Sequence, residues 1–333
     1  MIPMRWLLRR LALGAAGLLL CLVAAEGVLR LWNPFGISYH LSVERFLDLE
    51  DGAVQPAEPP LPYVLRPGRV HDDAFVARIN SLGMRGPEVS EHKPEGSFRL
   101  LFLGDSVAFG LGVDDGECFA DRLRERLSRG APVEVLNAGC PGYNGMHEAI
   151  WLQRFGLRLQ PDLVLVVFIP DDPPRIFSDE DLVRREGHRR SFAYRFFESR
   201  FGEPLYLKQL LRHLYWVQLQ TSNQLEEVFD VGGSGITEDS WSAYLSVLDE
   251  MGRMVEAQGA RFGVIGTQHQ TLLEEHCRMR GWPYLPGHDL PLASVPMSWR
   301  LSATDAHPNA EGHRVLADLI LEHLLRLKLV PVR

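Results

Sequence analysis

Residues 163–169 (LVLVVFI) form a run in which every side chain is apolar, directly after Pro161-Asp162. A strand buried on one face alternates apolar with polar residues, so an unbroken apolar run of strand length indicates burial on both faces. Parallel sheets covered by helices on both sides provide that environment. This segment therefore favours an α/β protein.

The segments around this run repeat a strand–helix rhythm. Strands are expected at 98–103, 133–136, 163–169, 262–266 and 282–285, and helices at 118–127, 146–159, 241–257, 272–280 and 311–327. A further short strand is expected at 75–79. The predicted fold class is α/β, with a doubly wound, flavodoxin-like parallel five-stranded sheet in a three-layer α/β/α arrangement.

The N-terminus is apolar over residues 11–25 and is preceded by Arg5, Arg9 and Arg10. Basic residues before such a segment keep the N-terminus in the cytoplasm and send the rest of the chain across the membrane. The run is short for a span of about 20 residues unless its apolar neighbours extend it. We expect a retained transmembrane helix, a signal-anchor, with the body on the outer (periplasmic or extracellular) face of the cytoplasmic membrane. A signal peptide cleaved after Ala25 is the alternative.

The formal net charge is −8, and the part of the chain after the basic N-terminus is more acidic still. Because attraction to phosphate dominates nucleic-acid affinity, nucleic-acid binding is excluded. We divide the chain into an anchor or signal segment at 1–32, a Pro-rich tether and small preface at 33–96, and an α/β domain at 97–333. An insertion at about 171–240, rich in Arg and aromatic residues, is either a cap or membrane-surface helix, or an ordinary amphipathic helix on the sheet.

Three cysteines, Cys118, Cys140 and Cys277, come after the apolar segment. In an exported domain two of them can pair as a disulfide, or all three can serve as small buried hydrophobes. The spacing of Cys and His matches no zinc site, and neither a dinucleotide fingerprint nor a phosphate loop is present. No metal or cofactor is expected.

Three polar clusters lie at the ends of expected strands or before the last helix. They are Gly104-Asp105-Ser106, Asn137-Ala138-Gly139 and Asp305-Ala306-His307-Pro308-Asn309. A serine hydroxyl is a weak nucleophile that needs an imidazole to take its proton and a carboxylate to orient the imidazole. Ser106, His307 and Asp305 supply these three groups. The plainer interpretation is that Gly-Asp-Ser is a turn and that Asn309 caps a helix.

In this order the three clusters, the first of them preceded by Phe102-Leu103, resemble the first, second and last sequence blocks of the SGNH (GDSL-type) hydrolases over roughly residues 98–327. The stretch 79–86 (INSLGMRG) and the apolar N-terminus resemble membrane-tethered bacterial members, which are associated with cell-surface polysaccharides. The resemblance implies that Ser106 is the nucleophile, His307 its base and Asp305 the orienting acid. It also implies that the backbone N–H groups of Ser106 and Gly139 form the oxyanion hole.

Two positions depart from the family pattern. The acid usually stands three residues before the histidine, where this chain has Thr304, and Asp305 stands two before it. The third block, Gly-x-Asn-Asp, is replaced by Ile169-Pro170-Asp171-Asp172, so that Asp171 takes the place of the amide donor. An ionised carboxylate only accepts hydrogen bonds, which weakens the expected oxyanion hole.

The function expected from this resemblance is that of an exported, membrane-anchored serine esterase. It would remove O-acyl groups, in the first place acetyl groups, from an envelope glycan or a similar ester through an acyl-serine intermediate. One alternative is an O-acyltransferase that passes the same acyl group to a cell-surface polysaccharide. The other is a non-catalytic glycan-binding protein of the same fold, which the replacement at Asp171 favours.

Overall fold

A central parallel sheet of five strands organises the protein. The computed structural model describes residues 4–32, 43, 45–71, 75–129, 132–169, 238–267, 270–286, 296–302 and 305–331. The sheet strands are β5 (Phe98–Leu103), β6 (Val133–Asn137), β7 (Leu163–Phe168), β8 (Arg261–Gly266) and β9 (Tyr284–Pro286). Their spatial order is β6-β5-β7-β8-β9, and each neighbouring pair is parallel. The predicted doubly wound α/β fold is therefore confirmed.

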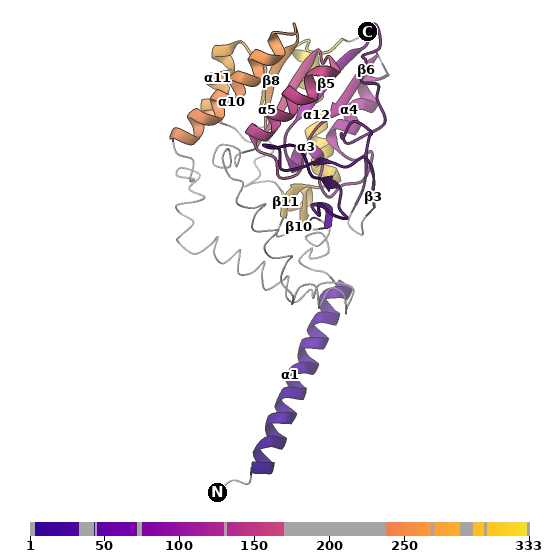
Figure 1. Ribbon diagram of the computed structural model, residues 1–333, viewed down its shortest axis with the longest axis vertical. Helices are drawn as coiled ribbons and strands as arrows, with labels where there is room; N and C mark the ends of the chain where they lie inside the picture. Colours follow the sequence, from indigo (N-terminus) through magenta and orange to yellow (C-terminus); the bar gives the residue numbers. More distant parts are fainter. Residues whose placement is uncertain are drawn as a thin grey trace.

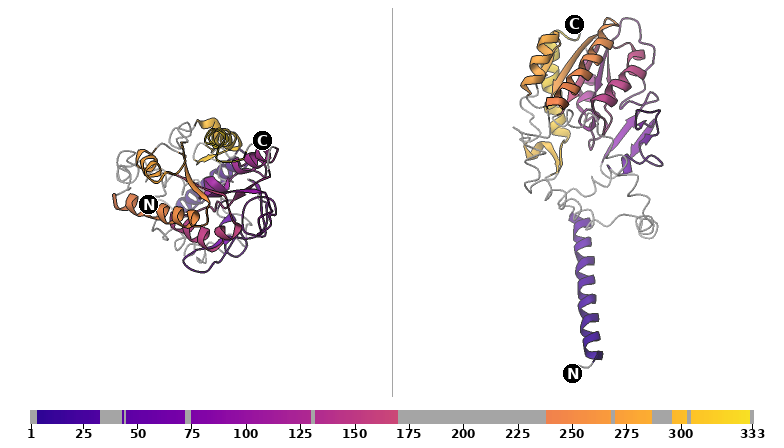
Figure 2. Two further views of the ribbon diagram at one scale, coloured as in Figure 1. Left: turned by 90° about the horizontal axis from the view of Figure 1, so that it is seen from above. Right: turned by 60° about the vertical axis from the view of Figure 1, so that its left-hand side comes forward.

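Helices cover both faces of this sheet (Figure 1). One face packs against α4 (Phe119–Leu127) and α12 (Ala310–Arg326), and the other against α5 (Gly145–Arg154), α10 (Glu238–Glu256) and α11 (Thr271–Arg280). Successive residues of β5 alternate between the two cores: Leu101 belongs to the α5–α10 side and Leu100 to the α4–α12 side. This alternation is the reason the strands are apolar at every position. Figure 2 shows the layers from two further directions.

The 146–159 segment differs from the single helix that its apolar spacing predicts. The α-helix α5 ends at Arg154, and a 3-10 helix η1 (Gly156–Leu159) comes after it. Gly156 lies against Trp151 and Leu152, where a side chain on Gly156 would stand only 3.0 Å from Leu152. The chain therefore tightens at this point to bring η1 against the sheet.

The described part of the 33–96 preface packs against the α/β body as an additional layer. It contains two short antiparallel pairs, β1 (Val54–Gln55) with β2 (Val64–Leu65) and β3 (Gly68–His71) with β4 (Val76–Ile79). Phe46, Tyr63 and Phe75 are buried in the same core as α5 and α10. The composition of the segment, rich in proline and without periodicity, gives no hint of this packing.

The N-terminal helix α1 (Met4–Trp32) stands apart from the α/β body (Figure 1). Residues 8–32 have the length and apolar composition needed to cross a membrane, with a mean hydropathy of 2.1, and their most apolar window is not buried in the protein. A signal sequence has the same properties, so the helix fits both the anchor and the cleaved segment.

Several predicted features lie outside the described residues. Asp171 and the expected insertion as far as residue 237 are among them, and residues 238–240 form the first turn of α10. Thr304 also lies outside.

Candidate active site

The nucleophile candidate stands at a tight strand-to-helix turn. Ser106 is the first residue of α3 (Ser106–Phe109), which begins three residues after β5 ends, and β5 lies where the strand order reverses. The Asp105 carboxylate caps α3 by accepting the backbone N–H of Val107 at 2.8 Å. Gly104 has a φ of +150°, and a Cβ there would stand 2.6 Å from the Cβ of Ala108. Only glycine fits this turn, which places Ser106 at the carboxyl edge of the sheet.

The three residues expected to act together lie in one hydrogen-bonded chain. Ser106 Oγ is 2.7 Å from His307 Nε2, and His307 Nδ1 is 2.6 Å from Asp305 Oδ1. The same Asp305 oxygen accepts the backbone N–H of His307 at 2.8 Å. This geometry matches the nucleophile–base–acid arrangement, in which each group orients the next.

His307 lies on a short strand, whereas the sequence predicts a loop before the last helix. It belongs to β11 (Asp305–Pro308), which pairs with β10 (Arg300–Ser302) in a separate two-stranded sheet. Asn309 then caps α12 by accepting the N–H groups of Glu311 and Gly312, each at 3.0 Å, as its position predicts. The strand and the cap together fix the backbone that carries the imidazole.

The protonation pattern can be derived from these contacts. With a carboxylate at Nδ1, the neutral imidazole carries its proton on Nδ1 and leaves Nε2 to accept from Ser106. Asp105 Oδ2 also lies 3.2 Å from Ser106 Oγ, but the single hydroxyl proton serves one acceptor at a time and His307 is the nearer. The side chains of His307 and Asp305 are 29% and 10% exposed, so a substrate can reach the imidazole while the carboxylate is shielded.

Other reactive groups near this turn are held in their neutral forms. Burial raises the pKa of the Cys118 thiol to about 11, and burial likewise raises the pKa of Cys140 well above its ordinary value. Because the thiolate is the nucleophile, neither cysteine competes with Ser106. Burial also lowers the pKa of His313 to about 3, with smaller contributions from Arg85 and His307. Cys118, Cys140 and Cys277 are buried free thiols, as the hydrophobic interpretation expects.

Only one of the two backbone N–H groups that the sequence predicts as oxyanion donors is unpaired in the described part of the chain. Ser106 N–H opens the first turn of α3 and has no hydrogen-bond partner in the described part of the chain. Gly139 N–H, the second expected donor, donates to the Asn137 side chain at 3.0 Å. A Cβ on Gly139 would stand 2.3 Å from the Phe109 nitrogen, so Gly139 allows β6 to approach α3. Its role as an oxyanion donor stays a prediction that this geometry does not favour.

A neighbouring glycine, which the sequence blocks do not mark, offers a better-placed donor. Cys140 to Tyr143 form a turn closed by a 3.0 Å hydrogen bond, and the carbonyl of Pro141 accepts from the Tyr63 hydroxyl at 2.6 Å. The C=O and N–H of a trans peptide point in opposite directions, so Gly142 N–H points away from buried Tyr63. Within the described residues this N–H has no partner. The Pro-Gly pair, typical of the centre of a type II turn, is the sequence signal that marks it.

The remaining described residues bring no group of three or more His, Cys, Asp or Glu side chains close enough to hold a metal ion.

Comparison with known proteins identifies the family. The model of the GDSL-like lipase/acylhydrolase family matches residues 102–315, which is more than half of the chain and includes Ser106 and His307. The chain belongs to the GDSL-like lipase/acylhydrolase family. This membership places it in a family of ester hydrolases and confirms the resemblance drawn from its sequence blocks. A sequence search of curated proteins found no match.

Solved structures of similar fold include other GDSL-type proteins and esterases. TesA is 15% identical with a TM-score of 0.43, and the match covers 68% of this chain and 97% of TesA. A two-domain esterase (CEX) active on acetylated mannans is 15% identical with a TM-score of 0.44, over 71% of this chain and 50% of that one. The acetylxylan esterase Axe2 of Geobacillus stearothermophilus, as a catalytic mutant, is 12% identical with a TM-score of 0.41, over 68% and 94%. At these identities the likeness concerns the fold.

Proposed function

We propose that this GDSL-family protein is a membrane-anchored serine esterase that removes O-acyl groups, in the first place acetyl groups, from an envelope glycan. The observation that carries the proposal is the hydrogen-bonded chain from Ser106 through His307 to Asp305. Two segments far apart in the sequence, one with Ser106 and the other with Asp305 and His307, bring the three groups together in the order that acyl transfer requires. The turn at Ser106 is partly exposed, so an ester can approach the hydroxyl.

The proposed reaction proceeds in two displacements. Ser106 Oγ attacks the acyl carbon while its proton passes to His307 Nε2, and Asp305 stabilises the resulting imidazolium. The tetrahedral intermediate collapses as the imidazolium returns the proton to the departing sugar oxygen. Water then attacks the acyl-serine, giving its proton to His307, and the second collapse releases the carboxylic acid and restores Ser106.

The negative oxygen of each intermediate needs hydrogen-bond donors aimed at it. We infer that the N–H groups of Ser106 and Gly142 provide two of them, because both are unpaired within the described residues and both come after adjacent strands, β5 and β6. Each such donor is worth roughly 10²–10³ in rate. Asp171 is proposed to stand near the same oxygen, where its charge would slow the reaction.

The proposed location rests on α1. Arginines before the apolar stretch support a cytoplasmic start of this helix. In this proposal the α/β body lies on the outer face of the cytoplasmic membrane, next to envelope polysaccharide.

The deciding experiment treats the full chain, solubilised in mild detergent, with a fluorophosphonate probe and locates the adduct by mass spectrometry. We expect the adduct on Ser106 of the wild type and no labelling of Ser106→Ala. Ser128→Ala, which changes an exposed serine at the end of α4, is the matched control and should be labelled normally.

The same preparation then distinguishes hydrolase from transferase. Acetate released from an acetylated oligosaccharide supports the esterase, whereas acetyl groups recovered on an added acceptor glycan support the O-acyltransferase. An unlabelled wild type, beside a labelled control esterase, would leave the non-catalytic glycan-binding alternative.

A further inference from the structure

The stretch INSLGMRG, which no step of the proposed reaction uses, forms a tight loop at the end of β4. The side-chain oxygen of Asn80 accepts the backbone N–H groups of Leu82 and Met84, at 3.1 and 3.0 Å. The backbone N–H of Asn80 donates to the carbonyl of Met84 at 2.8 Å, which closes the loop. The loop thereby fixes the backbone position from which Arg85 extends.

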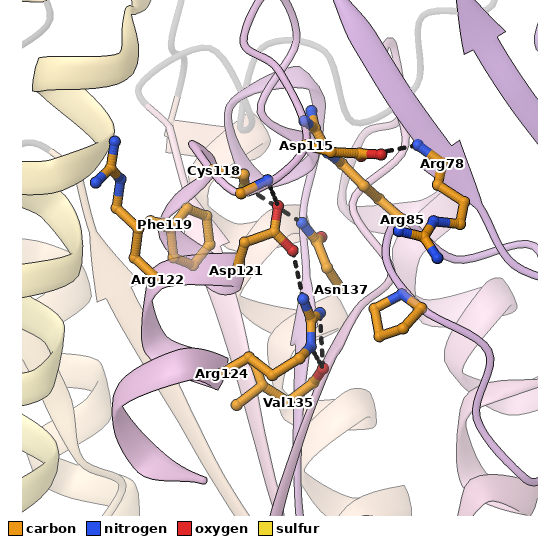
Figure 3. Close-up of polar contacts among 12 residues, drawn as sticks. Arg78, Arg85, Asp115, Cys118, Phe119, Asp121, Arg122, Arg124, Val135 and Asn137 are labelled. Carbon is orange, nitrogen blue, oxygen red and sulfur yellow. Dashed lines mark hydrogen bonds and ion pairs between the residues drawn. The ribbon is translucent and has the colours of Figure 1, made fainter. Parts of the chain in front are cut away.

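Arg85 joins this loop to the central sheet. Its backbone N–H donates to the carbonyl of Asn137, the last residue of β6, at 3.0 Å, and bridges link it to both Ile79 and Asn137. The residue is only 1% exposed. Figure 3 shows Arg85 and Asn137 together with Cys118 in this region.

The buried guanidinium of Arg85 is held by backbone carbonyls. Four of its N–H donors reach the carbonyl oxygens of Phe109 (3.2 Å), Gly110 (2.5 Å), Val113 (2.7 Å) and Asp114 (2.9 Å). Among the described residues no carboxylate forms an ion pair with it. A planar fork with five donors can satisfy such a spread of acceptors, whereas an ammonium group cannot.

These carbonyls belong to the end of the nucleophile helix and the loop after it. Helix α3 has only 4 residues, so its last carbonyls lack partners within the helix. The Asn137 side chain donates to the carbonyl of Ala108 at 2.9 Å. Arg85 donates to the next two carbonyls along the chain, those of Phe109 and Gly110. Two side chains from outside the helix thus complete its C-terminal end.

A short relay connects Arg85 to Ser106 itself. Gly110, whose carbonyl accepts from Arg85, donates its own N–H to the carbonyl of Ser106 at 3.0 Å, and Leu111 N–H donates to the same oxygen at 3.0 Å. Moving the Gly110 peptide therefore moves the peptide of Ser106. Because catalysis is sensitive to displacements of about 1 Å, this connection bears on the rate.

We propose that Arg85 is a positioning residue, contributed by the segment before the family-matched region, that holds α3 so that Ser106 meets His307. The inference rests on the proposed function for its catalytic consequence. It assigns to the INSLGMRG stretch the task of completing the nucleophile turn from outside the hydrolase domain.

The test replaces Arg85 by lysine in the full chain, which retains the charge and removes the fork. Arg66→Lys is the matched control, because Arg66 also lies in the preface and donates to two carbonyls, those of Leu49 and Glu50, away from the nucleophile. Turnover of p-nitrophenyl acetate gives kcat and KM. Hydrogen exchange with mass spectrometry reports the backbone at 106–114 independently of activity.

We expect Arg85→Lys to lower kcat by about tenfold or more while KM changes less than about threefold, because the bound ester is unaffected and the nucleophile is displaced. Peptides covering 106–114 should exchange faster, while those covering β7 and β8 keep their wild-type rates. Arg66→Lys should match the wild type in every measurement.

Unchanged kcat together with unchanged exchange at 106–114 would overturn the proposal. If Arg85→Lys does not fold, the wild type alone decides: the amides of Gly110 and Leu111 should be as protected as those of β5, and fast exchange there would refute the role. A wild type without esterase turnover would refute the proposed function, and the exchange measurement would still show whether Arg85 holds the turn.

Discussion

Replacing Asp305 by asparagine separates the charge of the acid from its hydrogen bonds. One oxygen of Asp305, Oδ1, accepts both the Nδ1–H and the backbone N–H of His307. In Asp305→Asn, the amide oxygen should stay on the backbone N–H, since the amide nitrogen cannot accept. The same oxygen then still accepts Nδ1–H, and Nε2 remains free to take the proton of Ser106.

Asp305→Asn should therefore lower kcat only through the loss of the negative charge beside the imidazolium. Two charges about 4 Å apart interact by about 4 kcal/mol at an effective dielectric constant of about 20. Partial exposure of both side chains, 29% and 10%, reduces this through solvent screening to roughly 2–3 kcal/mol. Since about 1.36 kcal/mol corresponds to a tenfold rate change, kcat should fall roughly 30- to 150-fold.

The measurement is kcat for a small acetyl ester with the wild type, Asp305→Asn, Asp305→Ala and His307→Ala. Asp305→Ala should lose more than Asp305→Asn, because both hydrogen bonds disappear, and less than His307→Ala, because some imidazole remains correctly posed. A loss near 10⁴ in Asp305→Asn would mean that the amide nitrogen faces Nδ1 and imposes the wrong tautomer. That result, or no loss at all, would refute the shared-oxygen reasoning.

Four further predictions concern other parts of the chain. His307→Ala should lower turnover by several orders of magnitude, and equal activity would remove His307 from the site. A reporter fused after Arg333 that works only when exported should be active, and activity confined to a cytoplasmic reporter would contradict the topology. The folded pKa of His313 is depressed to about 3, so its stability contribution is complete above about pH 6.5 and is lost as the pH falls. Between about pH 7 and pH 5 the free energy of unfolding of the wild type should fall by about 2 kcal/mol more than that of His313→Gln, as measured by thermal unfolding. Identical losses would contradict the lowered pKa of His313. Asp171→Asn should hydrolyse a simple acetyl ester faster than the wild type between about pH 6 and 9, whereas an unchanged or lower rate would place Asp171 away from the oxyanion.

The elements carried by strong apolar patterns could be predicted from the sequence. The run at 163–169 contains the observed strand Leu163–Phe168, and its burial on both faces is what the composition requires. That Ser106, His307 and Asp305 lie close together could also be predicted, because each stands beside an expected strand end or helix start. The structure places them within hydrogen-bonding distance of one another.

Contacts made by irregular segments could not be predicted in the same way. Tyr63 and Phe46 are buried in the main core, yet nothing periodic surrounds them in the sequence. The sequence does not distinguish Arg85 from an exposed charged residue, because only the fold brings the carbonyls of residues 109–114 around its guanidinium. The difference between Gly139 and Gly142 depends on the direction in which each N–H points. The Pro141-Gly142 pair predicts the turn, but not that its N–H stays unpaired.

Ser106 and His307 meet across 201 residues of sequence, which makes the site one of the last features to form during synthesis. At about 5–20 residues per second, roughly 10–40 s separate the appearance of the two side chains. Throughout that interval the growing chain carries Ser106 without its proposed base. A chain that ends before residue 305 therefore lacks both the base and the acid that the proposed reaction needs.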